Sequence, residues 1–465
     1  MGSTYSMDMC SGSILRKMIV YTLPLMASGV LQLLFNAADV IVVGKFAGDT
    51  ALAAVGSTSA LINLITNLFI GLSVGANVAA ARYAGAGKKE ELSHTVHTSM
   101  LLSVISGIVL TAVGIPLARV LLKLMQTPDS ILGLATDYLT IYFCGMTFMM
   151  IFNFGNAILR AIGDTRRPLI ILVISGVVNI ILNLVFVIVF KMSVSGVATA
   201  TVISQAVSAV LIVRVLMKEP AESGIRLNLR ELKIYRSKLL LIARIGLPAG
   251  FQGTIFSLSN VVIQSSINLF GEIVVAGNSA AASIEGFVYI AMNSWYQSTL
   301  SFTGQNIGAC RYERITKILL SGLLCVTLTW AVLGLGVVAF SKPLLSIYTS
   351  GEQAIEAGAQ RLMVVSGTYA LCGIMDVMVG GIRGLGYSVL PMIVSLLGAC
   401  GLRLVWIATV FNIEEFHTPF TVYVSYPVSW LATILAHIVC YVIIRARLRR
   451  KIENQKKDEP ALEKA

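Results

Sequence analysis

Residues 85–92 read GAGKKEEL, and residues 308–315 read GACRYERI. Each stretch directly follows a long apolar run, begins with Gly-Ala and then becomes charged. The second stretch follows the first after nearly half of the chain. A motif that returns in this way predicts an internal duplication.

Two further matches support the duplication. The sequence RAIG at 160–163 returns as RGLG at 383–386, at the same offset as the Gly-Ala stretches. The Leu-Pro pair at 23–24 returns at 247–248, at almost that offset. Because separate matches at nearly one offset are hard to obtain by chance, we expect two structurally related halves.

The composition excludes a soluble domain. Hydrophobic residues make up 56% and charged residues 12% of the 465-residue chain, and the mean hydropathy is +0.82, whereas about one-quarter of a soluble domain is charged. The apolar residues form twelve runs of roughly 20 residues or more, the length that an α-helix needs to cross a bilayer. The predicted spans are 18–43, 52–80, 93–117, 131–158, 168–190, 196–217, 240–269, 273–303, 318–340, 358–382, 389–411 and 420–444.

Each half contains six spans, which is an even number, so the second half begins on the same side of the membrane as the first. The predicted fold is therefore an all-α polytopic membrane protein with twelve transmembrane helices in two parallel six-helix repeats. We divide the chain into an N-terminal lobe at 1–217, a cytoplasmic linker at 218–239, a C-terminal lobe at 240–447 and a basic, polar tail at 448–465.

The net charge of +12 lies mostly in the connections between the spans. Most Lys and Arg residues fall on one side, which also holds both termini, and basic loops remain in the cytoplasm. We therefore expect a multi-pass protein of the cell membrane with both termini cytoplasmic, and a tail that contacts anionic lipid rather than nucleic acid. The opposite connections carry only Lys45, Arg119, Lys123, Lys191, Lys342 and Arg361.

Span 1 contains a polar stripe. Gln32 and Asn36 precede Asp39 by seven and three residues, which places all three on one face of a helix. A charged side chain inside a span is costly, so Asp39 is a functional candidate by default. Gln32 and Asn36 are candidates for lining a substrate cavity.

Spans 5 and 6 supply further oxygen atoms. Asn179 and Asn183 lie at i and i+4 on one helix face, and Thr201 follows in span 6. Together with Asp39 they offer one carboxylate and several neutral oxygens, a set suited to Na⁺, and the carboxylate could instead take a proton. Hydrogen bonding between helices is an equally good explanation of the two asparagines alone.

The second half carries different charges inside its spans, namely Glu285, Asp376 and Arg403. They could bind a cationic substrate, or they could form buried ion pairs that only hold helices together. Asp376 occupies the place that Asn153 has in the first half, and Asn156 is a further polar cavity candidate. The two lobes are thus chemically unequal.

Other classes of protein find little support. The chain lacks a constellation of His, Ser or Cys with an acid at catalytic spacing, and it lacks a nucleotide-binding motif. No filter-like segment favours a channel. The seven cysteines show no CxxC spacing, so we expect no metal ion beyond a coupling Na⁺, no cofactor and no enzymatic activity.

These motifs resemble the multidrug and toxic compound extrusion (MATE) family over all twelve spans. The likeness rests on Pro24, the segment 39–44, the two Gly-Ala motifs, RAIGD at 160–164 and its counterpart at 383–386, and the asparagines of span 5. It implies V-shaped lobes that rock between inward-open and outward-open states. It also implies cation-coupled export of amphipathic, often cationic, compounds.

The resemblance places the family's coupling residues on Asp39, Asn179, Asn183 and Thr201. The family often has an aspartate where this chain has Asn183, which lowers the expected Na⁺ affinity and leaves H⁺ coupling open. The alternative function is a flippase for a lipid-linked precursor. A flippase would need a basic cavity for the phosphate groups, but the acids within the spans are at least as prominent as Arg403. We expect small-molecule substrates, a bilayer environment and a monomer.

Overall fold

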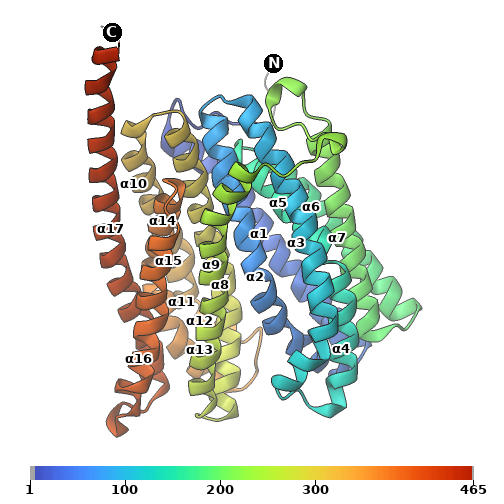
Figure 1. The fold of residues 1–465 in the computed structure, drawn as a ribbon. Helices are drawn as coiled ribbons and strands as arrows, with labels where there is room; N and C mark the ends of the chain where they lie inside the picture. Colours follow the sequence, from blue (N-terminus) through green and yellow to red (C-terminus); the bar gives the residue numbers. More distant parts are fainter. Residues whose placement is uncertain (1–5, 463–465) are drawn as a thin grey trace.

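The computed structural model describes residues 6–462. Over this range the chain forms helices and no strand, and the two halves form two helix bundles that stand side by side (Figure 1). The predicted all-α fold is confirmed. Residues 1–5 of the predicted N-terminal lobe and residues 463–465 of the predicted tail lie outside the described range.

The first half forms the helices to the right of Figure 1, and most of them match predicted spans to within a few residues. Their bounds are α1 Ile14–Phe46, α2 Asp49–Gly85, α3 Lys89–Leu124, α4 Asp129–Cys144, α5 Met146–Ala161, α6 Arg166–Leu184 with a π-helical turn at Val185–Val189, and α7 Ser193–Met217.

The second half repeats this order after two short 3₁₀ turns in the linker, Ala221–Ser223 and Leu229–Glu231. Its elements are α8 Arg236–Asn268, α9 Glu272–Gly308, α10 Tyr312–Thr329, a π-helical turn Trp330–Gly334, α11 Leu335–Ala339, α12 Ser341–Leu345, α13 Glu352–Val364, a 3₁₀ turn Ser366–Thr368, α14 Ala370–Gly384, α15 Val389–Ser395, a π-helical turn Leu396–Gly401, α16 Leu402–Ala408, 3₁₀ turns Val410–Asn412 and Glu414–Phe416, and α17 Pro419–Leu462.

Both halves bend one span at the equivalent place. The helices α4 and α5 meet at 48° around Gly145, and α13 and α14 meet at 42° after Thr368. Gly145 and Thr368 are separated by the same offset as the two Gly-Ala stretches. Ten of the described helices are long and apolar enough to cross a membrane alone, and counting each bent pair as one span gives the predicted twelve.

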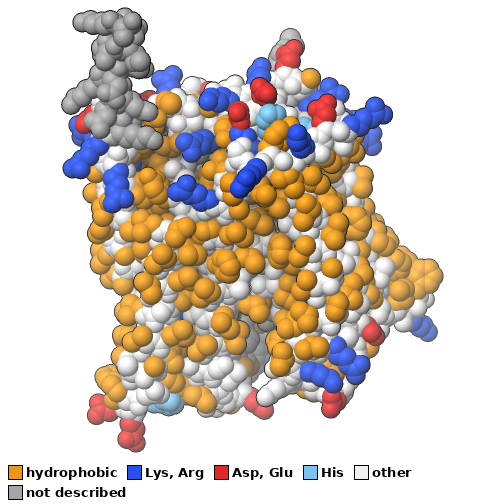
Figure 2. All heavy atoms as spheres, viewed as in Figure 1, with side chains coloured by type: hydrophobic (Ala, Val, Ile, Leu, Met, Phe, Trp, Pro, Cys, Tyr) orange, Lys and Arg blue, Asp and Glu red, His pale blue; other side chains and the backbone are white. Residues whose placement is uncertain are grey.

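The surface is that of a membrane protein. Figure 2 shows a band of hydrophobic side chains across the middle of the molecule, and most of the visible Lys and Arg side chains lie at the end that holds both termini. Many large apolar side chains are exposed, such as Val210 and Val439, as expected where lipid replaces water.

The two lobes touch at the end that holds the termini, and the contact is symmetric. A Cβ atom added to Gly85 of α2 would meet the backbone carbonyl of Gln305, and one added to Gly308 of α9 would meet that of Arg82. Gly308 follows Gly85 at the offset of the repeat, and Gln305 follows Arg82 at the same offset. The repeats are therefore related by a pseudo-two-fold axis through this contact, and only glycine permits so close an approach of two backbones.

An N-terminal strap, defined as residues 7–12, crosses this end of the molecule. The Met7 N–H donates to the Ile162 carbonyl of the first lobe over 3.2 Å. Asn306 of α9 donates to the Met9 carbonyl over 3.0 Å, and the Met9 side chain is buried in the core of the second lobe. The strap thus joins both lobes at their closed end.

Asp8 shapes the strap. Its carboxylate accepts hydrogen bonds from the Cys10 N–H over 2.8 Å and from the Ser11 hydroxyl, and Lys17 lies 3.8 Å away. Burial alone would raise the pKa of Asp8, but these hydrogen bonds and the Lys17 charge hold that pKa below its ordinary value. Asp8 therefore stays ionised at neutral pH and continues to fix the turn.

Candidate functional site

The polar residues predicted for spans 1, 5 and 6 come together inside the first lobe. The Asn183 side-chain amide donates to the Asp39 carboxylate over 2.5 Å and to the Asn179 oxygen over 3.2 Å. The Thr201 hydroxyl lies within hydrogen-bonding reach of Asp39 and also donates to the Val197 carbonyl over 2.9 Å. The helices α1, α6 and α7 thus meet at one cluster of oxygen atoms.

The local helix geometry explains this meeting. The i, i+4 spacing places Asn179 and Asn183 on one face of α6, and that face is turned towards α1. The π-helical turn Val185–Val189 starts shortly after Asn183. Turns of this type inside α-helices often mark functional sites, because they redirect side chains.

The cluster retains unused capacity to bind a cation. Asn183 is fully buried and Asn179 is 5% exposed. The Asn183 side-chain oxygen is buried without a hydrogen-bond donor, although buried polar atoms are normally paired. Among the described residues no group of three or more His, Cys, Asp or Glu could hold a metal ion, so any cation here would rely on one carboxylate and neutral oxygens.

Two tyrosines near this cluster had not been predicted. Tyr138 and Tyr142 of α4 stack with ring centroids 6.0 Å apart, and both are close enough to Asp39 to feel its charge. Tyr142 also forms a hydrogen bond with Gln205 of α7. The i, i+4 spacing of the tyrosines was the available signal, but aromatic residues in an apolar span are usually read as packing.

The other first-lobe candidates are Gln32, Asn36, Asn153 and Asn156. Gln32 and Asn36 have exposed side chains on α1. In α5, Asn153 donates to the Met149 carbonyl one turn earlier over 2.9 Å, whereas the Asn156 side-chain oxygen is buried without a partner.

Glu285 forms a buried ion pair, but with a partner that had not been predicted. The Arg361 guanidinium forms a bidentate ion pair with the Glu285 carboxylate, with Nη2 2.6 Å from Oε2 and Nε 3.0 Å from Oε1. Arg361 also donates to the Asn278 oxygen over 2.7 Å. From the sequence, the Arg361 charge is counted with a connection, although the residue falls near the start of the predicted span 358–382. In the structure it lies inside α13 and is only 8% exposed.

The predicted pairing of Arg403 with Glu285 or Asp376 is wrong. Arg403 of α16 donates to the Ser429 hydroxyl over 3.1 Å, and its guanidinium lies 4.1 Å from the centre of the Tyr426 ring. Among the side chains that the structure describes, no carboxylate lies within ion-pair distance of Arg403. The aromatic ring takes the place of a counter-charge.

Asp376 lines a cavity of about 180 Å³ between the two lobes. Asn67 of α2 contributes from the first lobe, whereas Gln252 of α8, Asn293 of α9 and Asp376 of α14 contribute from the second. Asn293 forms a hydrogen bond with the Asp376 carboxylate. The carboxylate thus faces a cavity between the lobes whose walls are partly polar and partly apolar.

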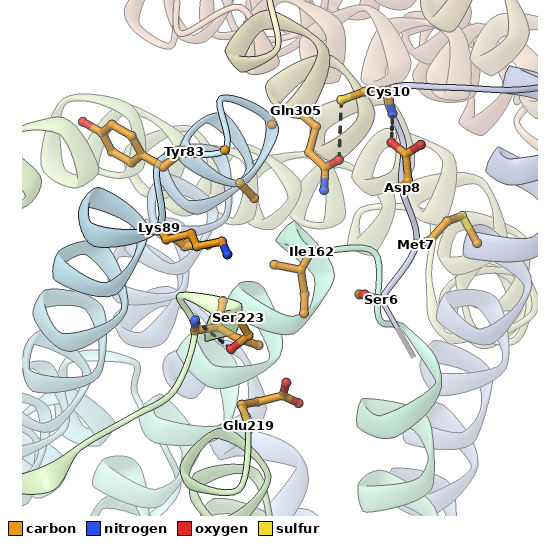
Figure 3. A pocket seen from close by; sticks show the side chains of 15 residues that line it. Ser6, Met7, Asp8, Cys10, Tyr83, Lys89, Ile162, Glu219, Ser223 and Gln305 are labelled. Carbon is orange, nitrogen blue, oxygen red and sulfur yellow. Dashed lines mark hydrogen bonds between the residues drawn. The ribbon is translucent and has the colours of Figure 1, made fainter. Parts of the chain in front are cut away.

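A second cavity, of about 380 Å³, lies at the end of the molecule that holds the termini. Figure 3 shows the strap along one wall, with the Cys10 sulfur directed at Gln305, and Lys89 pointing inward from another wall. Gln305 in turn donates to the Ala161 carbonyl of the first lobe over 2.7 Å. This cavity therefore lies at the junction of the lobes, on the closed side.

Comparison with known proteins places this geometry in context. The MatE family model matches residues 24–185 and again residues 248–409. The probable multidrug resistance protein YoeA of Bacillus subtilis is 27% identical, over 91% of this chain and 92% of that protein. The probable multidrug resistance protein NorM of Thermotoga maritima is also 27% identical, over 84% of each. The solved outward-facing structure of a MATE family transporter has a TM-score of 0.88 at 22% identity, covering 97% of this chain and all of that one.

The two matched segments have equal length, which agrees with the internal duplication. At their offset, Asp39 of the first half corresponds to Ile263 and Asn183 corresponds to Ile407, and both second-half residues are apolar. The oxygen cluster of the first lobe is therefore not repeated in the second.

Proposed function

The chain belongs to the MatE family of membrane transporters, and we propose that it exports amphipathic small molecules, often cationic ones, in exchange for Na⁺ or H⁺. The observation that carries the proposal is the buried oxygen cluster around Asp39. The relatives named as multidrug resistance proteins favour this class of substrate. We propose no catalytic activity, because the family consists of transporters.

In the proposed mechanism, Asp39 receives the coupling ion. A hard cation such as Na⁺ takes oxygen ligands, and the buried Asn183 oxygen has no donor to compete with it. Asn179 and Thr201 supply further oxygens. Proton coupling requires only that the Asp39 carboxylate be neutralised. Either ion would change the charge at the point where α1, α6 and α7 meet.

Coupling then follows from a preference of the ion for one arrangement of the lobes. A ligand shifts an equilibrium only by its difference in affinity for the two states. The symmetric contact of Gly85 and Gly308 closes the end that holds the termini, and we propose that this end is cytoplasmic and that the described arrangement faces outward. Substrate release to the outside would accompany ion binding at Asp39.

The test is efflux of a fluorescent organic cation from proteoliposomes under imposed Na⁺ and H⁺ gradients, with the wild type and Asp39→Asn. We expect wild-type efflux to follow one of the two gradients and Asp39→Asn to lose that dependence. Asp49→Asn, an exposed acid at the start of α2, is the matched control and should behave as the wild type. Undiminished ion-driven efflux by Asp39→Asn would overturn the coupling role.

A further inference from the structure

Two opposite charges line the cavity between the lobes without forming a salt bridge with each other, although each lies close enough to feel the other's charge. Asp376 and Arg383 both belong to α14 and both line the cavity of about 180 Å³. Across the described residues, neither takes part in a salt bridge. We propose that this cavity is a subsite for zwitterionic head groups, in which Asp376 holds the positive end of the ligand and Arg383 the negative end. The inference rests on the proposed function and names its substrate class.

Arg383 has no anionic hydrogen-bond partner among the described residues. It is 5% exposed and donates to the Tyr296 hydroxyl over 3.0 Å and to the Gln252 side-chain oxygen over 2.8 Å. Both acceptors are neutral, and the Arg383 Nε atom is buried without a partner. A buried cation is expensive unless it is paired. An anionic group in the cavity would supply the missing partner.

Asp376 is the complementary half of the site. Its carboxylate is partly buried and its hydrogen-bond partner is the neutral amide of Asn293. An ammonium group on a ligand would make a charge-assisted hydrogen bond there, which is stronger than a bond between neutral groups.

The helix sets the distance between the two charges. Asp376 and Arg383 lie two helical turns apart, so they share one face of α14 with about 10 Å of helix rise between them. The long Arg383 side chain can shorten the gap between the charged groups. The cavity is slightly larger than the roughly 150 Å³ that accommodates benzene in another protein. It therefore fits a head group rather than a whole drug-sized molecule.

The combination of charges is confined to the second half of the chain. At the offset of the repeat, Arg383 corresponds to Arg160, but Asp376 corresponds to the neutral Asn153. Neither Asn153 nor Arg160 lines this cavity. The two positions in the first lobe therefore carry only a positive charge, whereas the two positions in the second lobe carry one negative and one positive charge.

Three matched ligands test the proposal by direct binding to the full-length protein, with no ion gradient. They are Nε-dansyl-lysine, which is a zwitterion, its methyl ester, which keeps only the positive charge, and its Nα-acetyl derivative, which keeps only the negative charge. Dansyl fluorescence reports binding. We expect the wild type to bind the zwitterion about tenfold more tightly than either analogue, because truncating one partner of a buried charge pair has an effect of at least this size.

The variants assign the two ends of the ligand. Arg383→Gln should remove the preference for the zwitterion over the ester, and Asp376→Asn should remove the preference over the acetyl derivative. Arg160→Gln, the same substitution at the repeat-related position, should leave both preferences intact. If Arg383→Gln does not fold, as judged by gel filtration, Arg383→Lys replaces it and should keep part of the preference over the ester.

Equal wild-type affinity for the three ligands overturns the proposal. An equal decrease in the affinity of Arg383→Gln for all three ligands also overturns it, because that result would indicate a structural role for Arg383. Because the assay measures binding, its failure is distinguishable from a failure of ion-driven efflux.

Discussion

Asn183 donates its side-chain amide to the Asp39 carboxylate over 2.5 Å and so ties α6 to α1 inside the first lobe. The amide dipole of Asn183 stabilises the carboxylate, but less strongly than an opposite charge at the same place would. The contact explains how a single acid can be kept inside a span. Because Asp39 is the one carboxylate of the described cluster, the affinity of the proposed site for a cation should depend strongly on adding a second carboxylate.

The first prediction concerns Asn183→Asp. A second carboxylate beside Asp39 should increase Na⁺ affinity about tenfold, because hard cations bind more tightly as ligand charge increases. The Na⁺ concentration that gives half-maximal dye efflux should fall accordingly. Asn412→Asp, which adds an exposed acid to the second lobe, serves as the control. An unchanged Na⁺ dependence would separate Asn183 from the ion site.

The second prediction concerns the buried pair of Glu285 and Arg361. Glu285→Gln leaves a guanidinium without its counter-charge and should reduce the free energy of unfolding by about 3–5 kcal/mol. Thermal unfolding of the purified protein measures the loss. The double variant Glu285→Gln, Arg361→Met should be more stable than the sum of the two single changes implies. Strictly additive effects would mean that the pair does not interact as the geometry indicates.

The first lobe shows why part of the site was predictable from sequence. Asp39 stands out because charge is rare in spans, and Asn179 and Asn183 share a helix face because of their spacing. The sequence alone does not show that α1 and α6 bring these groups together. However, so few polar side chains lie within these apolar helices that they have few other partners than one another.

The partner of Glu285 could not be predicted in the same way. Arg361 is 76 residues away in sequence, and its charge was counted with a connection although it falls near the start of the predicted span 358–382. An ion pair between distant helices leaves no periodic signal in the sequence. The cavity that joins Asp376 to Arg383 was missed for a related reason, because Arg383 lies just past the end of the predicted span 358–382 and was used only as part of the repeated motif.

The third prediction concerns orientation in the membrane. The clustering of Lys and Arg at the end that holds the termini (Figure 2) predicts that this end is cytoplasmic. A green fluorescent protein fused after Arg450 should fluoresce, and one fused after Gly351, in the connection between α12 and α13, should not. Alkaline phosphatase fusions at the same sites should give the reverse pattern. Fluorescence of the Gly351 fusion together with phosphatase activity of the Arg450 fusion would contradict the assigned orientation.

The fourth prediction concerns closure of the lobes. A side chain at Gly308 would meet the Arg82 carbonyl across the pseudo-two-fold contact, so Gly308→Val should force the closed end apart. The readout is the rate at which a maleimide labels Cys10, kept as the only cysteine, because Cys10 lies in the strap over this contact (Figure 3). We expect labelling to accelerate about tenfold, and Gly85→Val should have the same effect because the two contacts are equivalent. Gly336→Val, where an added Cβ meets nothing within 4 Å, should leave the rate unchanged. If Gly308→Val remained folded and Cys10 labelling did not accelerate, the glycine contact would not be what holds this end of the transporter closed.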